Sequence, residues 1–346
     1  MNDGEVPILG WDVGGANIKV ASADAARCAG VVERAFPMWR ERDRLTSVLA
    51  ELADRFGRAP IMGVTMTAEL ADCFATKREG VAYVIDAFER AFPASAMWIY
   101  GVDGRFRSPE EARRRPLDVA AANWMASASL IARAYPSSLF VDVGSTTSDI
   151  VPIVAGRVAA AGFTDVARLQ SGELVYTGCL RTPVCAIVRS VPLGSGGSRV
   201  AAEYFAIAAD AYRWLSRITD EDYTCDTPDG RGRSRAEAGA RLARMVCVDF
   251  DIAAESDVTA IADRVMRTQI RDIAHGIQQV LRRLRNTRPH VAIVAGSGSF
   301  LGRAAAEAND LQVRELASDL GTDAARAAPA AAVAHLLAER LCASVP

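Results

Sequence analysis

The sequence predicts an α/β fold with two similarly built domains. At 346 residues the chain exceeds the usual size of one hydrophobic core, and its length favours about two domains. A strand, a glycine turn and a second strand occur twice, as WDVGGANIKVA at 11–21 and VDVGSTTSDIV at 141–151. Alternating helical and extended patterns surround both copies, as in α/β domains. Such internal similarity indicates that one structural unit is used twice.

The first domain is expected at residues 1–135. Apolar runs on both sides of the glycine turn predict a β-hairpin at the start of the chain. The patterns that follow indicate a third strand at 30–36, a helix at 40–56, a strand at 61–67, a helix at 81–92, a strand at 97–102 and a helix at 116–135.

The second domain is expected at residues 136–323. After its own hairpin, short apolar runs between glycine and proline predict inserted strands and loops at 171–196. A helical region at 199–285 is interrupted by a polar surface loop at 220–234. A strand, a glycine-rich turn and a helix follow near 290–307, and a closing alanine-rich helix is expected at 324–341, with residues 324–346 packing back on the first domain.

Composition excludes several classes of function. The 40 basic and 42 acidic residues leave a formal charge of −2, which gives no general electrostatic reason to expect nucleic acid or an anionic membrane as partner. The acidic beginning of the chain does not resemble a secretory signal, and no run of about 20 apolar residues is present, so we expect a cytoplasmic protein. Seven cysteines without a CxxC pair and three scattered histidines argue against a zinc site. The sequence leaves a homo-oligomer open.

Three glycine-rich turns after apolar strands are the candidate phosphate-binding elements. Glycine lets the backbone approach an anion closely, and successive N–H groups in such turns form an anion-binding nest. The third turn also opens a helix, whose first N–H groups are unpaired. None of the turns matches the P-loop or the dinucleotide-binding pattern. The residues concerned are Gly14, Gly15 and Asn17; Gly144, Ser145, Thr146 and Thr147; and Gly296, Ser297 and Gly298.

Asp12 and Asp142 end the strands that precede the first two turns. A carboxylate at this place can hold Mg²⁺ directly or through water, while the neighbouring amides bind the phosphate oxygens that the metal bridges. Each aspartate could instead cap its own turn. Because the two positions match, we favour Mg²⁺ and phosphate binding, with Asp12 also a catalytic candidate.

Lysine is almost absent from the chain. Only Lys19 and Lys77 are present, and the other 38 basic residues are arginine. Lys19 follows Asn17 by two positions on the second strand of the first hairpin, so both side chains are expected on one face. We expect Lys19 or Lys77 to contact a phosphate group, since a compact ammonium has been kept beside these motifs.

The order of the three turns is similar to the two phosphate motifs and the adenosine motif of the actin, sugar-kinase and Hsp70 superfamily. The resemblance implies two ribonuclease-H-like domains with a ligand cleft between them. The segments at 120–132 and 324–341 resemble the two helices that connect such domains.

Four segments, at 10–21, 66–81, 120–132 and 173–187, resemble the hydantoinase/oxoprolinase-related branch of this superfamily, and within it proteins of the tetrahydromethanopterin-linked one-carbon pathway. The resemblance implies a transferase of methanofuran biosynthesis. Such an enzyme condenses (5-(aminomethyl)furan-3-yl)methyl diphosphate with the phenol of a glutamyltyramine- or tyrosine-like acceptor, forms an aryl ether and releases diphosphate.

Under this interpretation Glu69, Asp72 and Lys77 are candidates for removing the phenol proton, and Arg181 for clamping a diphosphate or a glutamyl carboxylate. Alternatively, the 69–77 segment is a helix N-terminus with capping acids, and Arg181 is an ordinary surface arginine. ATP is not expected as a ligand if the transferase interpretation is right. The alternatives are an ATP-dependent phosphotransferase, an ATP-dependent hydrolase of the oxoprolinase type, and a nucleotide-sensing scaffold without catalysis.

Overall fold

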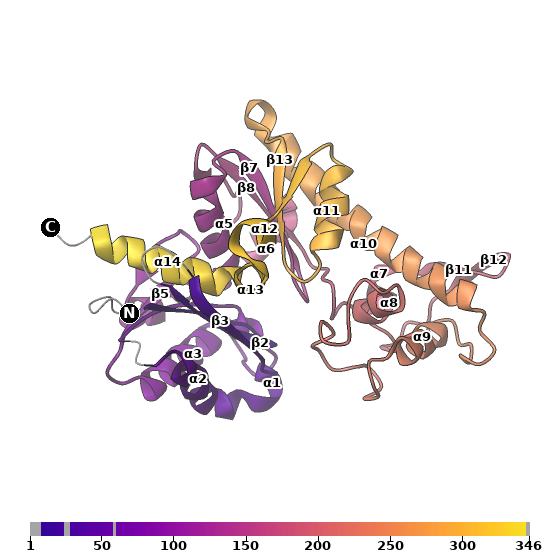
Figure 1. Cartoon of the computed structure of the whole chain (residues 1–346), viewed down its shortest axis with the longest axis horizontal. Coiled ribbons are helices and arrows are strands. Elements are labelled where there is room, and N and C mark those ends of the chain that lie inside the picture. The colour runs from indigo at the N-terminus through magenta and orange to yellow at the C-terminus, as the bar shows by residue number, and fades with distance from the viewer. Residues whose placement is uncertain (1–7, 24–27, 58–59, 344–346) are drawn as a thin grey trace. The chain divides into compact units, whose positions relative to one another are not determined.

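The computed structural model describes residues 8–23, 28–57 and 60–343 (Figure 1). Its chain is divided into two compact units. The first unit comprises residues 1–138, 153–167 and 316–346, and the second comprises 139–152 and 168–315. The boundaries fall within regular elements such as the strands β7 (Ser138–Val143) and β8 (Ser148–Val154).

The first unit is built on a six-stranded sheet in the order β3-β2-β1-β4-β5-β6. β1 and β2 form the predicted antiparallel hairpin, in which Asp12 lies opposite Lys19. β1 also pairs in parallel with β4, and this register places Thr65 beside Asp12. The strands are β1 (Ile8–Val13), β2 (Asn17–Ala23), β3 (Cys28–Ala35), β4 (Ile61–Met66), β5 (Ala96–Tyr100) and β6 (Phe106–Arg107).

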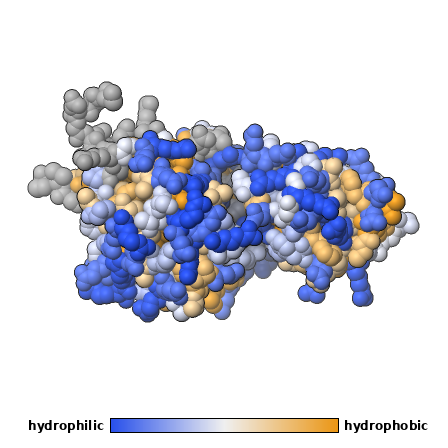
Figure 2. All heavy atoms as spheres, turned by 90° about the horizontal axis from the view of Figure 1, so that it is seen from below, coloured by the Kyte–Doolittle hydropathy of each residue, from blue (hydrophilic) through white to orange (hydrophobic). Residues whose placement is uncertain are grey.

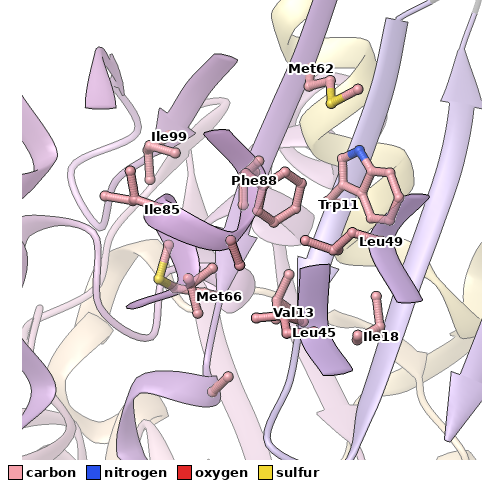
Figure 3. Close-up of a cluster of buried hydrophobic side chains, with 14 of the residues drawn as sticks. Trp11, Val13, Ile18, Leu45, Leu49, Met62, Met66, Ile85, Phe88 and Ile99 are labelled. Atoms are coloured by element: carbon pink, nitrogen blue, oxygen red, sulfur yellow. The ribbon is translucent and has the colours of Figure 1, made fainter. Parts of the chain in front are cut away.

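The main core of this unit lies between one face of the sheet and the helices α2 (Leu45–Ala53) and α3 (Lys77–Ala91). Side chains alternate along a strand, so Trp11 and Val13 of β1 point to the same face (Figure 3). The rings of Trp11 and Phe88 meet edge to face, with their centroids 5.4 Å apart. This packing fixes the strand that ends at the first glycine turn.

Helix α14 (Ala328–Ala343) packs on the other face of the same sheet. The approach is close because glycines stand under the helix. A Cβ atom on Gly10 would lie 2.0 Å from the backbone oxygen of Ala330, and one on Gly63 would lie 2.5 Å from a methyl carbon of Val333. The backbone of β1 and β4 therefore lies almost in contact with the helix.

The first unit has further helical segments, of which α5 and α13 contact α14. α5 packs against α14, where Arg133 and Glu339 form an ion pair of 2.8 Å. The segments are α1 (Met38–Glu41), η1 (Arg42–Arg44), η2 (Asp54–Phe56), η3 (Ala68–Leu70), α4 (Pro109–Arg114), η4 (Pro116–Asp118), α5 (Asn123–Ala134), α12 (Leu316–Leu320) and α13 (Thr322–Arg326).

The second sheet has the order β10-β8-β7-β13-β14, and β9 also pairs with β8. Its hairpin β7–β8, followed by the parallel strands β13 and β14, repeats the arrangement of β1–β2 with β4 and β5. The prediction of two similarly built α/β halves is confirmed. The further strands are β9 (Arg157–Val158), β10 (Leu174–Val175), β13 (Val291–Ala295) and β14 (Gln312–Glu315).

A largely helical insertion follows β10 in the second unit. Its longest member, α10, packs on α8, α9 and α11 and on the small β11–β12 hairpin. The elements of the insertion are α7 (Val184–Ile187), β11 (Ser190–Leu193), β12 (Gly196–Arg199), α8 (Ala208–Trp214), α9 (Arg235–Arg244) and α10 (Glu255–Leu284). Two other helices, α6 (Asp165–Ser171) before β10 and α11 (Ser299–Glu307) after β13, lie outside it.

Two helix expectations need correction. The helix expected at 116–135 is wrong in its first part, because α5 begins only at Asn123. Ala121 has a φ of 52°, a left-handed conformation that a right-handed helix cannot contain. The last helix begins at Ala328 instead of residue 324, since Pro329 in its first turn has no N–H to bond back to α13.

Figure 2 shows hydrophilic residues over most of the face that it draws, with hydrophobic residues in smaller patches between them. In the part of the chain that the structure describes, every helix is too short or too polar to cross a bilayer.

Candidate functional site

The first glycine turn presents a desolvated carboxylate. The Gly14 N–H donates to the backbone oxygen of Asn17 at 2.9 Å and closes the turn after Asp12. Asp12 is 7% exposed, and its Oδ1 atom has no hydrogen bond from any described residue. Burial raises the pKa of Asp12 to about 6, while Lys19 lowers it and Glu33 raises it. One oxygen of this carboxylate thus lacks the hydrogen bond that a buried polar atom normally has.

Lys19 is engaged within the first unit. Its Nζ atom donates to the backbone oxygen of Arg326 at 2.8 Å and lies 3.9 Å from a carboxylate oxygen of Glu33. The ammonium therefore links β2 to the end of α13. Its expected contact with a phosphate group stays a prediction.

Thr65 is a neighbour of Asp12 that the sequence analysis missed. It is fully buried, and its Oγ1 atom has no hydrogen-bond partner among the described residues. Thr65 looks like an ordinary strand residue in the sequence, and only the parallel pairing of β1 with β4 brings it beside Asp12. Two unsatisfied polar side chains thus lie together at the end of two strands.

The first unit contains a second cluster of charged residues. It includes Glu69 and Lys77, which the sequence predicted as site residues, and Asp165, which it did not. Lys77, the first residue of α3, forms a short ion pair with Asp165, the first residue of α6. Glu69, in η3, is 1% exposed, and neither of its carboxylate oxygens has a hydrogen bond of normal geometry within the described chain. Asp72 is exposed. Of these two predicted carboxyl groups, Glu69 is therefore the buried one and Asp72 the exposed one.

Burial raises the pKa of the Glu69 carboxyl to about 7. The amide of Glu69 itself, the Lys77 ammonium and the Ala121 amide lower the pKa, whereas Asp165 raises it. A carboxyl group with a pKa near neutral can take up and release protons at physiological pH.

In the second unit, the Gly144–Thr147 turn is hydrogen-bonded to the neighbouring loop that carries Arg181. The Gly144 N–H donates to the Thr147 oxygen at 2.9 Å, as in the first turn. The backbone oxygen of Ser145 accepts hydrogen bonds from the amides of Leu180 at 3.1 Å and Arg181 at 2.9 Å. Gly178 fits under this turn, because a Cβ atom there would lie 2.5 Å from the Thr146 nitrogen. The segment that carries Arg181 therefore belongs to the turn.

The third turn adjoins Asp142. Gly296 has a φ of 88°, and a Cβ atom on it would lie 2.4 Å from Asp142 Oδ1. The Gly298 N–H donates to the Val143 oxygen at 2.8 Å, just before α11 begins at Ser299. Two of the three predicted turns are thus brought together in one unit. Asp12 belongs to the other unit, and its approach to these turns stays a prediction.

A buried hydrogen-bond network holds the loop that carries Thr177 and Gly178, and the sequence does not reveal it. The Gln269 side chain of α10 donates to Thr177 Oγ1 at 2.6 Å and to the Gly178 oxygen at 2.9 Å. Its own oxygen accepts a short hydrogen bond from Tyr212. Ser148 Oγ donates to the Thr177 oxygen at 2.7 Å. An isolated glutamine in a long amphipathic helix gives no sign of this role in the sequence.

Arg181 is half-buried and faces the helical insertion. Its guanidinium lowers the pKa of Tyr204 and Cys225, although burial of these groups raises both pKa values more strongly. A positive charge thus lies beside the second turn, next to an exposed tyrosine. The described residues contain no group of three carboxylate, thiol or imidazole side chains able to hold a metal ion by themselves.

The chain matches two curated relatives. It is 36% identical over 339 residues, 97% of this chain and 99% of the relative, to the (4-{4-[2-(γ-L-glutamylamino)ethyl]phenoxymethyl}furan-2-yl)methanamine synthase of Methanocaldococcus jannaschii. It is 32% identical over 209 residues, 59% of this chain and 91% of the relative, to the synthase of the same name from Methanococcus vannielii.

Among solved structures, the ethanolamine utilization protein EutJ of Carboxydothermus hydrogenoformans matches 97% of this chain and 91% of its own, with a TM-score of 0.51 and 11% identity. A ROK family glucokinase from Streptomyces griseus matches 95% of this chain and 98% of its own, with a TM-score of 0.47 and 15% identity. The EutJ likeness concerns the fold alone. The family model of hydantoinase/oxoprolinase matches residues 61–340. With most of its length matched by that model, the chain belongs to the hydantoinase/oxoprolinase family.

Proposed function

We propose that this protein is a transferase of methanofuran-type cofactor biosynthesis, which joins a furanmethyl diphosphate to the phenol of a glutamyltyramine- or tyrosine-like acceptor. The observation that carries the proposal is the 36% identity to the M. jannaschii synthase over 97% of this chain. The name of that relative describes a phenoxymethyl group on a furan, which is an aryl ether between a phenol oxygen and a furan-bound methylene. Similarity over nearly the whole chain supports the same kind of bond formation here.

In the proposed reaction the phenol oxygen attacks the methylene carbon. The bond between this carbon and the diphosphate oxygen breaks, and diphosphate leaves with the bonding electrons. The phenol proton passes to a base, for which Glu69 is the best candidate because its pKa of about 7 suits proton uptake near neutral pH. The Glu69 carboxyl would later release this proton to water.

The leaving diphosphate needs groups that stabilise its growing negative charge. We assign this role to the backbone N–H groups of residues 145–147, which follow the Gly144 N–H that closes the turn, together with Arg181 beside the same turn. Lys19 and Lys77 are the candidate ammonium groups.

The donor set of the first turn fits Mg²⁺. Asp12 offers a buried oxygen without a partner among the described residues, and carboxylate oxygen is a preferred ligand of this ion. Since no three acidic groups gather in the described chain, most ligands would be water and diphosphate oxygens, as Mg²⁺ prefers. Within the first unit, Asp12 is the residue that would hold it. When bound, Mg²⁺ neutralises charge on the leaving diphosphate.

The test is to incubate the protein and Mg²⁺ with furanmethyl diphosphate and either glutamyltyramine or tyrosine, and to follow ether product by mass and diphosphate release by a coupled assay. We expect one ether per diphosphate released, without ATP. Thermal stabilisation by the furanmethyl diphosphate, but not by ATP, should accompany turnover. ATP consumption without ether formation would refute the proposal in favour of an ATP-dependent phosphotransferase or hydrolase. Stabilisation by ATP without any turnover would favour the scaffold.

A further inference from the structure

Asp165 is a charged residue near Glu69 that has no role in the proposed reaction. It begins α6 and forms a short ion pair with Lys77, which begins α3 and lies 88 residues earlier in the chain. Both side chains are partly buried, and both residues belong to the first unit. A pair of this kind has lost part of its hydration, so the two charges depend on one another.

Glu69 lies near this pair and is shielded from solvent. Its backbone is pressed against Gly80 of α3, where a Cβ atom would come within 2.5 Å of the Glu69 Cα. Its two carboxylate oxygens are buried without a normal hydrogen bond in the described chain. An ion pair between Lys77 and Glu69 would satisfy both groups, yet Lys77 pairs with Asp165 instead. Lys77 and Asp165 both act electrostatically on the Glu69 carboxyl, and their effects on its pKa have opposite signs.

The backbone near Glu69 is strained. Ala121, whose amide influences the Glu69 carboxyl, has a φ of 52°, and such a conformation costs an alanine about 1–2 kcal/mol. Strain of this kind persists where the surrounding structure imposes it, and it is concentrated at functional sites. The positive φ of Ala121 and the buried Glu69 carboxyl thus occur together at this place.

We propose that Asp165 is a positioning residue of this site: it holds the Lys77 ammonium in an ion pair and so leaves the buried Glu69 carboxylate without a cationic partner, ready to take the proton of the phenol. The inference rests on the proposed function and extends it. The charged groups that face Glu69 are Lys77 on α3 and Asp165 at the start of α6, while η3 and the segment around Ala121 contribute amides.

Opposite effects of two substitutions follow from this arrangement. Asp165→Asn removes the competing anion and releases Lys77 to pair with Glu69, so the pKa of Glu69 falls from about 7 toward its ordinary value. Lys77→Met removes the cation and leaves Asp165 unpaired, so the pKa of Glu69 rises. In Asp165→Asn the base becomes weaker, and the rate at its pH optimum should fall about tenfold or more, within the range that a positioned general base contributes.

The experiment compares the pH dependence of kcat/KM for the wild type, Asp165→Asn, Asp165→Glu and Lys77→Met. The acidic limb should move to lower pH in Asp165→Asn, to higher pH in Lys77→Met, and return toward the wild-type position in Asp165→Glu. Asp43→Asn, on the exposed surface of the same unit, is the matched control and should change nothing.

A second measurement needs no turnover. The infrared band of the Glu69 carboxyl, identified by its loss in Glu69→Gln, is titrated in each folded variant, and its midpoint should move in the same opposite directions. Unmoved midpoints and limbs would overturn the role of Asp165, even if the variants were slow. Wild-type protein that forms no ether at any pH would instead refute the proposed function, and with it the assignment of the phenol proton to Glu69.

Discussion

Replacing Glu69 by glutamine should change how the stability of the protein depends on pH. The pKa of Glu69 rises from the ordinary 4.5 to about 7 in the folded state because the carboxyl is buried. Below pH 4.5 both states are protonated. Above it the unfolded chain releases the proton while the folded protein keeps it, so rising pH favours unfolding until about pH 7. A tenfold change in proton affinity is worth about 1.4 kcal/mol, so the wild type loses about 3 kcal/mol over this interval.

Glutamine has no proton to lose, so Glu69→Gln should gain about 3 kcal/mol relative to the wild type between pH 4.5 and pH 8. The assay is urea unfolding of both proteins at several pH values, followed by tryptophan fluorescence. Titrating groups that the substitution leaves unchanged cancel in the difference. The cost of burying the glutamine amide does not vary with pH, so it shifts the whole difference by a constant and leaves its slope unchanged.

Glu51→Gln is the control of opposite sign. A hydrogen bond from Arg34 lowers the pKa of the exposed Glu51, so that its contribution is present at neutral pH and lost as the pH falls. The Glu51 variant should therefore lose stability relative to the wild type as the pH rises, by a small amount. A difference between Glu69→Gln and the wild type that stays flat from pH 4.5 to pH 8 would refute the assignment of Glu69 as a buried carboxyl with a raised pKa.

Three further substitutions test the packing around the glycine turns. Gly10→Ala pushes a methyl group into the backbone of α14 and should lower the free energy of unfolding by about 3 kcal/mol, whereas Gly196→Ala, with open space around it, should change it by less than about 0.5 kcal/mol; equal urea midpoints would contradict the packing described. Gly296→Ala should cost about 1–2 kcal/mol from its φ alone and weaken diphosphate binding in calorimetry, and unchanged affinity would argue against this turn as a phosphate site. Gln269→Leu leaves buried partners unsatisfied and should cost about 1–3 kcal/mol and raise KM for the diphosphate, while a normal KM would show that the network only stabilises the fold.

The repeated hairpins were predictable because their evidence is local. In each copy an apolar strand, an Asp-x-Gly turn and a second apolar strand follow one another within about a dozen residues. Asp12 and Asp142 could therefore be placed at strand ends from the sequence. The start of α5 was not predictable in the same way, since nothing in three consecutive alanines indicates that Ala121 adopts a positive φ.

The missed residues depend on contacts between distant parts of the chain. Thr65 lies beside Asp12 only through the parallel register of β1 and β4, and a shift of one residue would turn its side chain to the other face. Asp165 meets Lys77 across 88 residues, and Gln269 meets Thr177 across 92. Burial also cannot be read from residue type, so Glu69 and the exposed Asp72 looked alike as candidates until their surroundings were known.

The order of synthesis sets a constraint on how the first unit can fold. All six strands of its sheet precede residue 108, but α14, which covers one of its faces, begins at Ala328. At about 5–20 residues per second, a ribosome needs roughly 15–60 s to add the chain between β1 and α14. During that time the face that carries Gly10 and Gly63 lacks its helix, and the sheet of the second unit can form first. The unit that is begun first is thus completed last, because its sheet waits for α14.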